Sequence, residues 1–535
     1  MHLRQKFKNI GIRKQKNLWS ASIVLSLSFA LSAALGLIRE RVIYPRFLSC
    51  CPEQLDVYKA AFKLPDLVFK LLVTGALSAS FMPVFLSYHH KDKKHADALA
   101  STVINVLSLS LIVSLFIIYI FAWPFSRLLA PGFSQSQLLL MVRLTRILLV
   151  AQVFFLISNF FTSIIQANQI FLVSSISPIL YNLSIIFATF FLSPKWGIYG
   201  VCFGAVIGSF FHLIIQLPVI IKLKFKYSPI FNINIEGFKK IVKLMIPRSL
   251  GIGLSEIASF FSLRWSSLLP VGTFALYNLA LQIIFLPSRI FSTTISQASM
   301  PLLSRRLAEN KIRKFKDIVV KSLFQGLFLS LPVTVLVLVH RLAVVRLVFG
   351  SKSFPWSATL VIARTITYLS PSIFLQSIIQ VLNRAFYAAH DTKTPLKISL
   401  YSMIVSLSTT FILLKATKLE IFALAIGVSV SNLVQSVLLS ISFSQKVYRL
   451  NFTKLTNRFI KIFISSVFMG VTTWSFVRLF DHTLFDTSRT INLFLLVTVS
   501  SIAGIIVFAI SSKLLKIKEV SDISALLKSK KNTNK

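Results

Sequence analysis

Long apolar segments recur along the whole chain, separated by short polar segments. Each is about 20 residues long, which is enough for an α-helix to cross roughly 30 Å of hydrocarbon. The pattern predicts fourteen transmembrane helices, at residues 18–38, 64–88, 99–125, 138–163, 170–193, 199–221, 244–268, 274–300, 322–340, 358–382, 396–415, 421–444, 457–479 and 491–512. The expected fold is therefore an all-α polytopic membrane protein.

Two motifs occur twice, which indicates an internal repeat. Leu64–Phe69 (Leu-Pro-Asp-Leu-Val-Phe) is echoed by Leu286–Phe291 (Leu-Pro-Ser-Arg-Ile-Phe), and each is followed by an Ala-Ser pair and a further proline. Gly197–Gly204 is echoed by Glu420–Gly427 at nearly the same offset. The alternative is chance similarity among Leu/Phe-rich helices, although matching prolines and glycines are harder to obtain from composition. The repeat predicts two pseudo-symmetric six-helix lobes, the usual build of a secondary transporter with its site between the repeats.

These observations predict an order of segments. It comprises a basic N-terminus (1–17), an N-lobe of six helices (18–222), a cytoplasmic linker (223–243), a C-lobe of six helices (244–446), two further helices (457–512) and a basic tail (513–535). The first apolar run resembles a signal peptide in its basic flank, but it is longer than the usual apolar core of one. We expect a retained first helix.

Charge tests the helix assignment independently. The 535 residues are 55% hydrophobic and only 14% charged, yet carry a formal net charge of +42. Clusters of lysine and arginine occupy the two termini and every second loop, and all of these segments fall on one side of the predicted membrane, whereas the opposite loops carry few positive charges. This asymmetry indicates cytoplasmic termini and contact with anionic lipid headgroups. It excludes nucleic acid as the expected partner, because no soluble domain remains to present the charge.

The sequence offers no sign of an enzyme. It contains no nucleotide-binding loop, no nucleophile elbow and no metal-ligand spacing among its histidines and cysteines. No loop is long enough to fold as a catalytic domain. We expect no cofactor, and transport coupled to the membrane potential or to a monovalent ion.

Ionisable residues within membrane helices are the candidate functional groups, because inserting each costs about 2.5–3.5 kcal/mol. They are Arg39 and Glu40 on the first helix, Asp56, Lys59, Lys63, Asp66 and Lys70 around the second, and Glu256 and Arg264 on the seventh. Cationic side chains in a central cleft would suit a phosphate-bearing substrate. The alternative for any one of them is a side chain that extends to the membrane surface.

Five motifs stand out along the chain: Ser32–Glu40, Asp56–Asp66, Gly75–Pro83, Ser177–Asn182 and Phe386–Pro395. In this order they resemble the motifs of the MurJ/MviN family of lipid II flippases, and the resemblance covers about residues 20–445. It implies a V-shaped, two-lobed transporter that moves the undecaprenyl-pyrophosphate-linked peptidoglycan precursor, lipid II, from the inner to the outer leaflet. It also implies that helices 13 and 14 form a groove for the lipid tail, and that Arg39–Glu40 matches an arginine–acid pair lining the cavity.

The sequence departs from the family pattern at several cationic positions. Ala33 stands where the family often has an arginine, Phe69-Lys70 replaces a pair of arginines, and Gln282 stands where helix 8 usually carries one. We hypothesise that Arg264 compensates for Gln282, with an interfacial role as the alternative. Glu256 is expected to pair with a cation on another helix, for which Arg39 is the candidate.

The sequence is interpreted as a lipid II flippase of the bacterial cytoplasmic membrane. The candidate substrate-binding residues are Arg39, Glu40, Asp56, Lys63, Lys70, Glu256, Arg264 and Gln282. The alternatives are a flippase for another polyprenyl-linked oligosaccharide, a cation-coupled exporter of small molecules, and a non-transporting scaffold. The expected partners are lipid II, membrane lipids and the cell-wall synthesis machinery.

Overall fold

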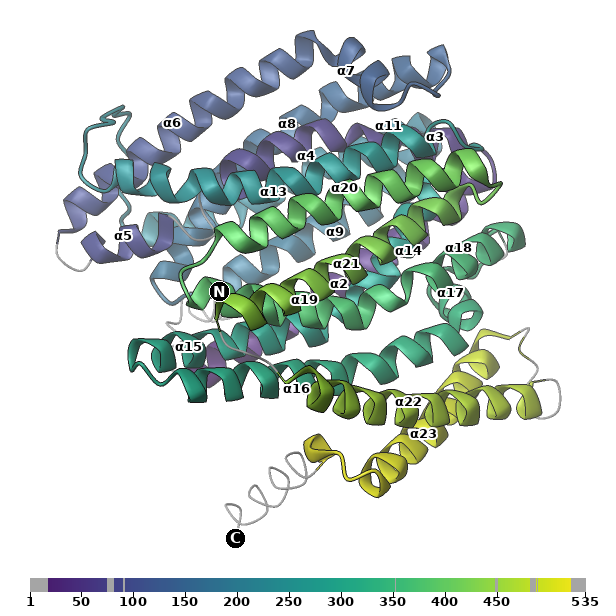
Figure 1. Ribbon diagram of the computed structural model, residues 1–535. Coiled ribbons are helices and arrows are strands. Elements are labelled where there is room, and N and C mark those ends of the chain that lie inside the picture. The colour runs from purple at the N-terminus through teal and green to yellow at the C-terminus, as the bar shows by residue number, and fades with distance from the viewer. Residues whose placement is uncertain are drawn as a thin grey trace, which may run out of the picture. The chain divides into compact units, whose positions relative to one another are not determined.

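The computed structural model describes residues 18–74, 81–89, 92–351, 353–447, 451–481, 487 and 489–520, most of which are helical (Figure 1). The chain divides into two compact units, Met1–Ala275 and Leu276–Lys535. This boundary lies after the seventh predicted helix, which the repeat had assigned to the second lobe. The seventh helix therefore makes its contacts mainly with the first unit.

The first unit contains thirteen helical segments among its described residues. They are α2 (Leu18–Leu48), α3 (Pro52–Ala61), α4 (Lys63–Phe69), η1 (Lys70–Thr74), α5 (Met82–His89), α6 (Lys93–Ile120), α7 (Ala122–Leu129), α8 (Gln135–Ala167), α9 (Leu172–Phe191), α10 (Ser193–Trp196), α11 (Ile198–Ile214), α12 (Leu217–Lys222) and α13 (Phe238–Ser266). Its largest fully buried side chains are aromatic, among them Tyr44, Phe81, Phe85 and Phe160.

The second unit begins within α14. Its elements are α14 (Thr273–Ser288), η3 (Arg289–Thr293), α15 (Thr294–Ala308), α16 (Ile312–Val339), α17 (Arg341–Phe349), α18 (Trp356–Leu369), α19 (Pro371–Ala388), α20 (Lys393–Ala416), α21 (Ile421–Lys446), α22 (Phe452–Phe480) and α23 (Thr490–Leu514). In Figure 1, α22 and α23 cross each other, and both contribute to a core cluster with Phe328, Met469 and Phe508. These two helices correspond to predicted helices 13 and 14.

Membrane spans agree broadly with the sequence prediction. Ten helical spans among the described residues are long and apolar enough to cross a membrane, and α18 with α19, bent by 40°, makes an eleventh. The other three of the fourteen predicted spans correspond to α2, to the segment that contains α4, η1 and α5, and to α13. These three carry most of the ionisable residues singled out from the sequence.

The outer surface of the helices is apolar, as a bilayer requires. Phe116, Phe191, Ile221 and Trp474 are among many large apolar side chains that are more than half exposed. In water such a surface would be an aggregation hazard, whereas lipid tails solvate it. The chain is a multi-pass membrane protein.

Backbone geometry supports the internal repeat. Gly197, which precedes α11, has φ 53° and ψ −134°, and Glu420, which precedes α21, has φ 47° and ψ −120°. A positive φ is unusual for a residue with a Cβ, so the same conformation at both repeat positions is difficult to obtain by chance. Seven residues further on, a Cβ on Gly204 would lie 2.4 Å from Ala188 Cβ, and one on Gly427 2.0 Å from Thr410 Oγ1. Both glycines therefore mark a close helix crossing.

The repeated Leu-Pro motif also has a structural counterpart. A π-helical turn follows it in each unit, at η1 after Pro65 and at η3 after Pro287. Proline lacks an N–H and disturbs the regular hydrogen-bond ladder, and π turns expose carbonyls that a straight helix would use itself. Ser249 Oγ on α13 donates to the carbonyl of Leu71 in η1 at 2.6 Å.

Candidate functional site

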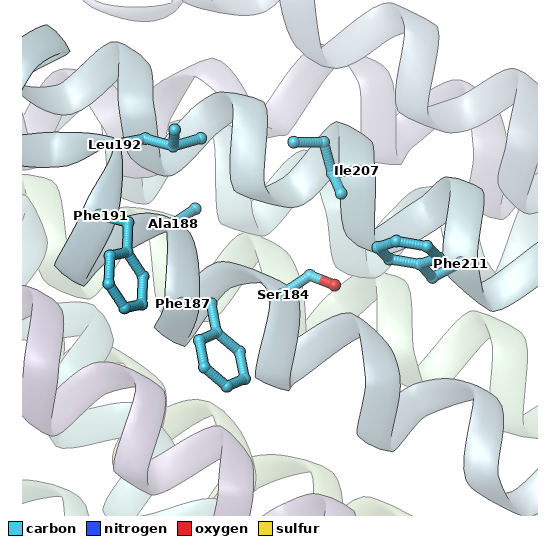
Figure 2. A pocket seen from close by; sticks show the side chains of 7 residues that line it. All are labelled: Ser184, Phe187, Ala188, Phe191, Leu192, Ile207 and Phe211. Atoms are coloured by element: carbon cyan, nitrogen blue, oxygen red, sulfur yellow. The ribbon is translucent and has the colours of Figure 1, made fainter.

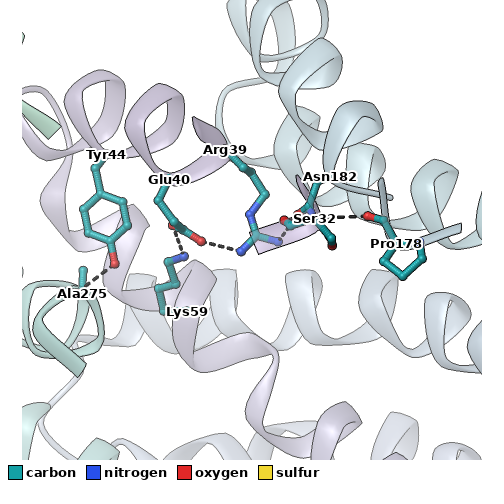
Figure 3. Close-up of polar contacts among 8 residues, drawn as sticks. All are labelled: Ser32, Arg39, Glu40, Tyr44, Lys59, Pro178, Asn182 and Ala275. Carbon is teal, nitrogen blue, oxygen red and sulfur yellow. Dashed lines mark hydrogen bonds and ion pairs between the residues drawn. The ribbon is translucent and has the colours of Figure 1, made fainter. Parts of the chain in front are cut away.

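A buried carboxylate lies between two cations in the first unit (Figure 3). Glu40 on α2 is fully buried. Its Oε1 lies 2.5 Å from an Nη of Arg39, and its Oε2 lies 2.6 Å from Nζ of Lys59 on α3. One anion therefore balances two cations, and the group keeps one positive charge. The arginine–acid pair singled out from the sequence is therefore in direct contact, and Lys59, which was among the candidate ionisable groups but not among the predicted substrate-binding residues, joins it.

Asn182 on α9 holds the other end of the Arg39 guanidinium. Its Oδ1 accepts a hydrogen bond from Arg39 at 3.2 Å, while its amide nitrogen donates to the carbonyls of Ser32 and Pro178 at 3.3 and 3.2 Å. The two carbonyls fix the amide orientation, because an amide nitrogen can only donate. Arg39 Nε has no hydrogen-bond partner in the described part of the chain. The guanidinium is thus oriented and keeps an unused donor.

Lys59 is enclosed by aromatic rings. Its Nζ lies 5.1 Å from the ring centroid of Tyr44 and 5.5 Å from that of Tyr58, and its side chain is 12% exposed. Cation–π attraction compensates part of the cost of burying the ammonium group. The Tyr44 hydroxyl donates to the carbonyl of Ala275 at 2.8 Å, which fixes this ring. In the sequence, Lys59 was one of several ionisable residues around the second predicted helix, with nothing to distinguish it from its neighbours.

A second polar group joins α4 and η1 to α13. Lys70 Nζ lies 2.8 Å from Glu256 Oε1, and Lys63 Nζ donates to Ser259 Oγ at 2.5 Å. The hypothesis that Glu256 pairs with a cation on another helix is confirmed, but that cation is Lys70 rather than Arg39. Asp66, on the same helix as Lys63, accepts from Gln152 of α8 at 3.1 Å. Ser259 and Gln152 were missed because neutral polar residues in helices carry no distinctive sequence signal.

Asp56 has a structural contact in this conformation. Its carboxylate accepts hydrogen bonds from the backbone amides of Gly272 at 2.6 Å and Ala275 at 2.7 Å, at the N-terminus of α14. The first amides of a helix have no partner within the helix, and a carboxylate is favoured there by the helix dipole. Asp56 therefore caps α14 across 216 residues of sequence. A role in binding substrate stays a prediction.

Arg264 makes the contact expected of an interfacial residue. Its guanidinium donates to the carbonyl of Leu128, in the last turn of α7, at 2.5 Å. A cation at a helix C-terminus satisfies a free carbonyl and complements the helix dipole. Gln282 lies on α14 in the second unit. Compensation of Gln282 by Arg264 stays a prediction, and the observed contact favours the alternative.

A groove between α9 and α11 has a different character from these polar groups. The groove has a volume of about 290 Å³. Figure 2 shows the side chains that line it: Ser184, Phe187, Ala188, Phe191, Leu192, Ile207 and Phe211. Its lining is apolar except for one serine, so it suits hydrocarbon and not a charged headgroup. Among the described residues, no three His, Cys, Asp or Glu side chains are placed to hold a metal ion.

The chain is similar to proteins of one transporter family. The family described as "Lipid II flippase MurJ" matches residues 53–510. A probable lipid II flippase MurJ of Buchnera aphidicola subsp. Baizongia pistaciae is 26% identical over 462 residues, 85% of this chain and 88% of the relative. Its counterpart in Thermotoga maritima is 24% identical over 511 residues, 94% of this chain and 98% of the relative.

Solved structures agree on the fold. A lipid II flippase MurJ in an inward closed conformation superposes with a TM-score of 0.76 at 23% identity, covering 93% of this chain and all of the other. An inward-facing multidrug transporter of the MATE family has a TM-score of 0.63 at 14% identity, covering 82% of this chain and 99% of the other. The sequence match extends over most of the chain, and the chain therefore belongs to the MurJ family of lipid II flippases.

Proposed function

We propose that this chain translocates lipid II from the inner to the outer leaflet of the bacterial cytoplasmic membrane by alternating access. The family match supports the substrate. The observation that carries the proposal is the Arg39–Glu40–Lys59 group, because it places an oriented guanidinium and an excess positive charge inside a membrane-spanning unit. A pyrophosphate needs such a partner once its headgroup leaves water.

The three side chains suggest how Arg39 exchanges partners. When a phosphate oxygen takes the guanidinium, Glu40 loses Arg39 but keeps Lys59 at its other carboxylate oxygen. Without Lys59 the exchange would leave Glu40 as an unpaired buried charge, which is strongly unfavourable. Lys59 is thus a positioning residue that lets Arg39 alternate between Glu40 and the substrate.

Lys63 and Lys70 supply further positive charge for the same headgroup. In this conformation Lys63 donates a hydrogen bond to Ser259 and Lys70 forms an ion pair with Glu256, both on α13. Side-chain contacts that a moving helix can break are suitable elements of an alternating-access cycle. The exposed apolar faces of α22 and α23 suit the polyprenyl tail, with Phe468, Trp474 and Ile502 each more than half exposed.

The proposed topology places both termini, and the loops that carry the lysines and arginines, in the cytoplasm. We expect a membrane-impermeant maleimide added to intact cells to label Val271→Cys but not Ser304→Cys, in a background with serine at the three natural cysteines. Val271 is 58% exposed and therefore accessible to the reagent. Its neighbour Gly272 is unsuitable for a cysteine, because its φ of 90° would strain a residue that has a Cβ. Disrupted cells should label at both positions. Labelling of Ser304→Cys but not of Val271→Cys in intact cells would show that the orientation in the membrane is the opposite of the one proposed.

Complementation tests the function itself. A bacterium depleted of its own lipid II flippase should grow when it expresses this chain, and its membrane vesicles should carry lipid II in the outer leaflet. Ionophores applied to the same strain separate coupling to the membrane potential from coupling to a monovalent ion. Failure to restore growth, with the protein present in the membrane at normal abundance, would favour a different polyprenyl-linked substrate or a scaffold.

A further inference from the structure

The loop between α12 and α13, residues 223–237, is hydrogen-bonded to one face of α6. The α6 side chains that hold it are Lys93, Asp97, Ser101 and Asn105, four residues apart, which places them in one stripe along the helix. They contact the loop in order. Lys93 Nζ donates to the carbonyl of Leu223 at 3.1 Å, Asp97 accepts from the amide of Lys226 at 3.3 Å, and Ser101 accepts from the amide of Ser228 at 3.1 Å.

Asn105 holds the far end of the loop. Its amide nitrogen donates to the carbonyls of Ser228 and Ile230 at 3.0 and 2.9 Å, and its Oδ1 accepts from the hydroxyl of Tyr227 at 2.6 Å. The chain then turns back, and the carbonyl of Glu236 lies 3.2 Å from Nε2 of His95, near the start of α6. The loop therefore climbs α6 from Lys93 to Asn105 and returns, as the teal trace beside α6 shows in Figure 1.

The length of α6 along which the loop runs determines how far the loop tip lies from the start of that helix. Twelve residues of α-helix separate Lys93 from Asn105, a rise of about 18 Å. Beyond Asn105, α6 exposes a run of large apolar side chains that only lipid can cover, beginning with Leu109 at 54% and including Phe116 at 63%. The tip therefore reaches almost to the level at which the lipid-facing surface of α6 begins.

Charge and hydrophobicity are separated along the loop. At the tip, Ile230, Phe231 and Ile233 are 44%, 57% and 55% exposed. The two stretches that flank the tip, 222–226 and 236–243, carry six lysines and one glutamate: Lys222, Lys224, Lys226, Lys239, Lys240, Lys243 and Glu236. Apart from the hydroxyl of Tyr227, the α6 side chains bind the loop through its backbone, so the side chains of Ile230, Phe231 and Ile233 stay outside this contact.

We infer that this loop is a membrane anchor, whose apolar tip inserts at the boundary between headgroups and acyl chains and whose lysines bind anionic headgroups of the same leaflet. Apolar side chains backed by lysines are the arrangement by which segments bind a bilayer surface. A protein partner would have to cover the tip beside the lipid-facing part of α6, where lipid already lies.

The anchor has a consequence for the protein's own helices. Gly237, where the loop ends, has φ 95°, and a Cβ there would lie 3.0 Å from both Tyr88 and Leu99 side chains. The loop thus returns in tight contact with α5 and α6 immediately before α13 begins. Only a short segment, itself in contact with α5 and α6, separates the loop tip from the start of α13. Insertion of the tip into lipid therefore restrains the start of α13.

The test uses the full-length protein in lipid nanodiscs. A fluorophore sensitive to polarity is attached at Phe231→Cys, with Lys239→Cys as the matched position in a flanking stretch, in a background with serine at Cys50, Cys51 and Cys202. We expect blue-shifted emission at position 231 and several-fold stronger quenching there by acyl-brominated lipid than at position 239. Water-like emission at both positions would overturn the anchor.

The charge component has its own variants. In discs that contain phosphatidylglycerol, Lys224→Gln with Lys226→Gln should reduce quenching at position 231 to the level seen in pure phosphatidylcholine. Lys415→Gln with Lys418→Gln removes the same charge from an exposed site outside the loop and should change nothing. Blue-shifted emission that brominated lipid does not quench would mean that protein covers the tip, and would also reject the proposal.

Discussion

Arg39→Ala is expected to abolish complementation of a flippase-depleted bacterium while leaving the protein in the membrane at normal abundance. The substitution removes the guanidinium that Glu40 and Asn182 orient. A hydrogen bond to a charged group contributes about 1.5–3 kcal/mol, which corresponds to roughly 10- to 150-fold in affinity for the headgroup. Growth on depletion and membrane abundance are measured together, so that loss of transport is separated from loss of protein.

Arg39→Lys is the matched control, because it keeps the charge and removes the planar, bidentate donor. We expect it to retain partial activity. If Arg39→Ala instead supports full growth, Arg39 only extends toward the membrane surface, and the proposed site is wrong even if the chain is a flippase.

Glu40→Gln is expected to destabilise the protein strongly, because it leaves Arg39 and Lys59 as neighbouring buried cations without an anion. Removing one partner of a buried ion pair costs about 3–5 kcal/mol, and we expect the lower end because Arg39 is 21% exposed. The apparent melting temperature in detergent should fall. Adding Lys59→Met should restore much of the loss, since a single cation beside the introduced amide and Asn182 is less unfavourable than two.

Glu309 provides the matched control for this prediction. It also lies between cations, since Arg305, Arg306 and Lys311 contact its carboxylate at 2.8–3.0 Å, and these hydrogen bonds lower its pKa to about 2. This group lies at the surface, where water replaces the lost partners, so Glu309→Gln should barely change the melting temperature. Equal effects of Glu40→Gln and Glu309→Gln would contradict the assignment of Glu40 to a buried charge network.

Glu40 and Glu256 show why the candidate site was only partly predictable from the sequence. The sequence identified Arg39 and Glu40 because charges within an apolar helix stand out. It also suggested a cation for Glu256, but assigned Arg39 where the structure has Lys70. Partner choice depends on which helix faces lie together, and an apolar sequence leaves several faces equivalent. The helix packing brings α13 against η1, where Lys70 is within reach.

Asp56 illustrates a second limit. From sequence it is an acid at the start of a membrane helix and therefore a candidate ligand. In the structure both of its oxygens accept amides at the start of α14. Nothing in local sequence signals a helix cap supplied from more than two hundred residues away, because capping motifs are read from neighbouring positions.

The sequence by itself determined the membrane character, the approximate spans and the repeat, because these depend on composition and on spacing along one chain. Helices with uniform apolar faces need about 20 residues to cross a bilayer, and that length is visible without a structure. The tertiary structure alone decided which polar groups meet: Lys59 with Glu40, Lys70 with Glu256, and the loop backbone with the stripe on α6. Such contacts depend on helix rotation and on crossing positions such as Gly204 and Gly427, where the absence of a side chain sets how closely two helices approach.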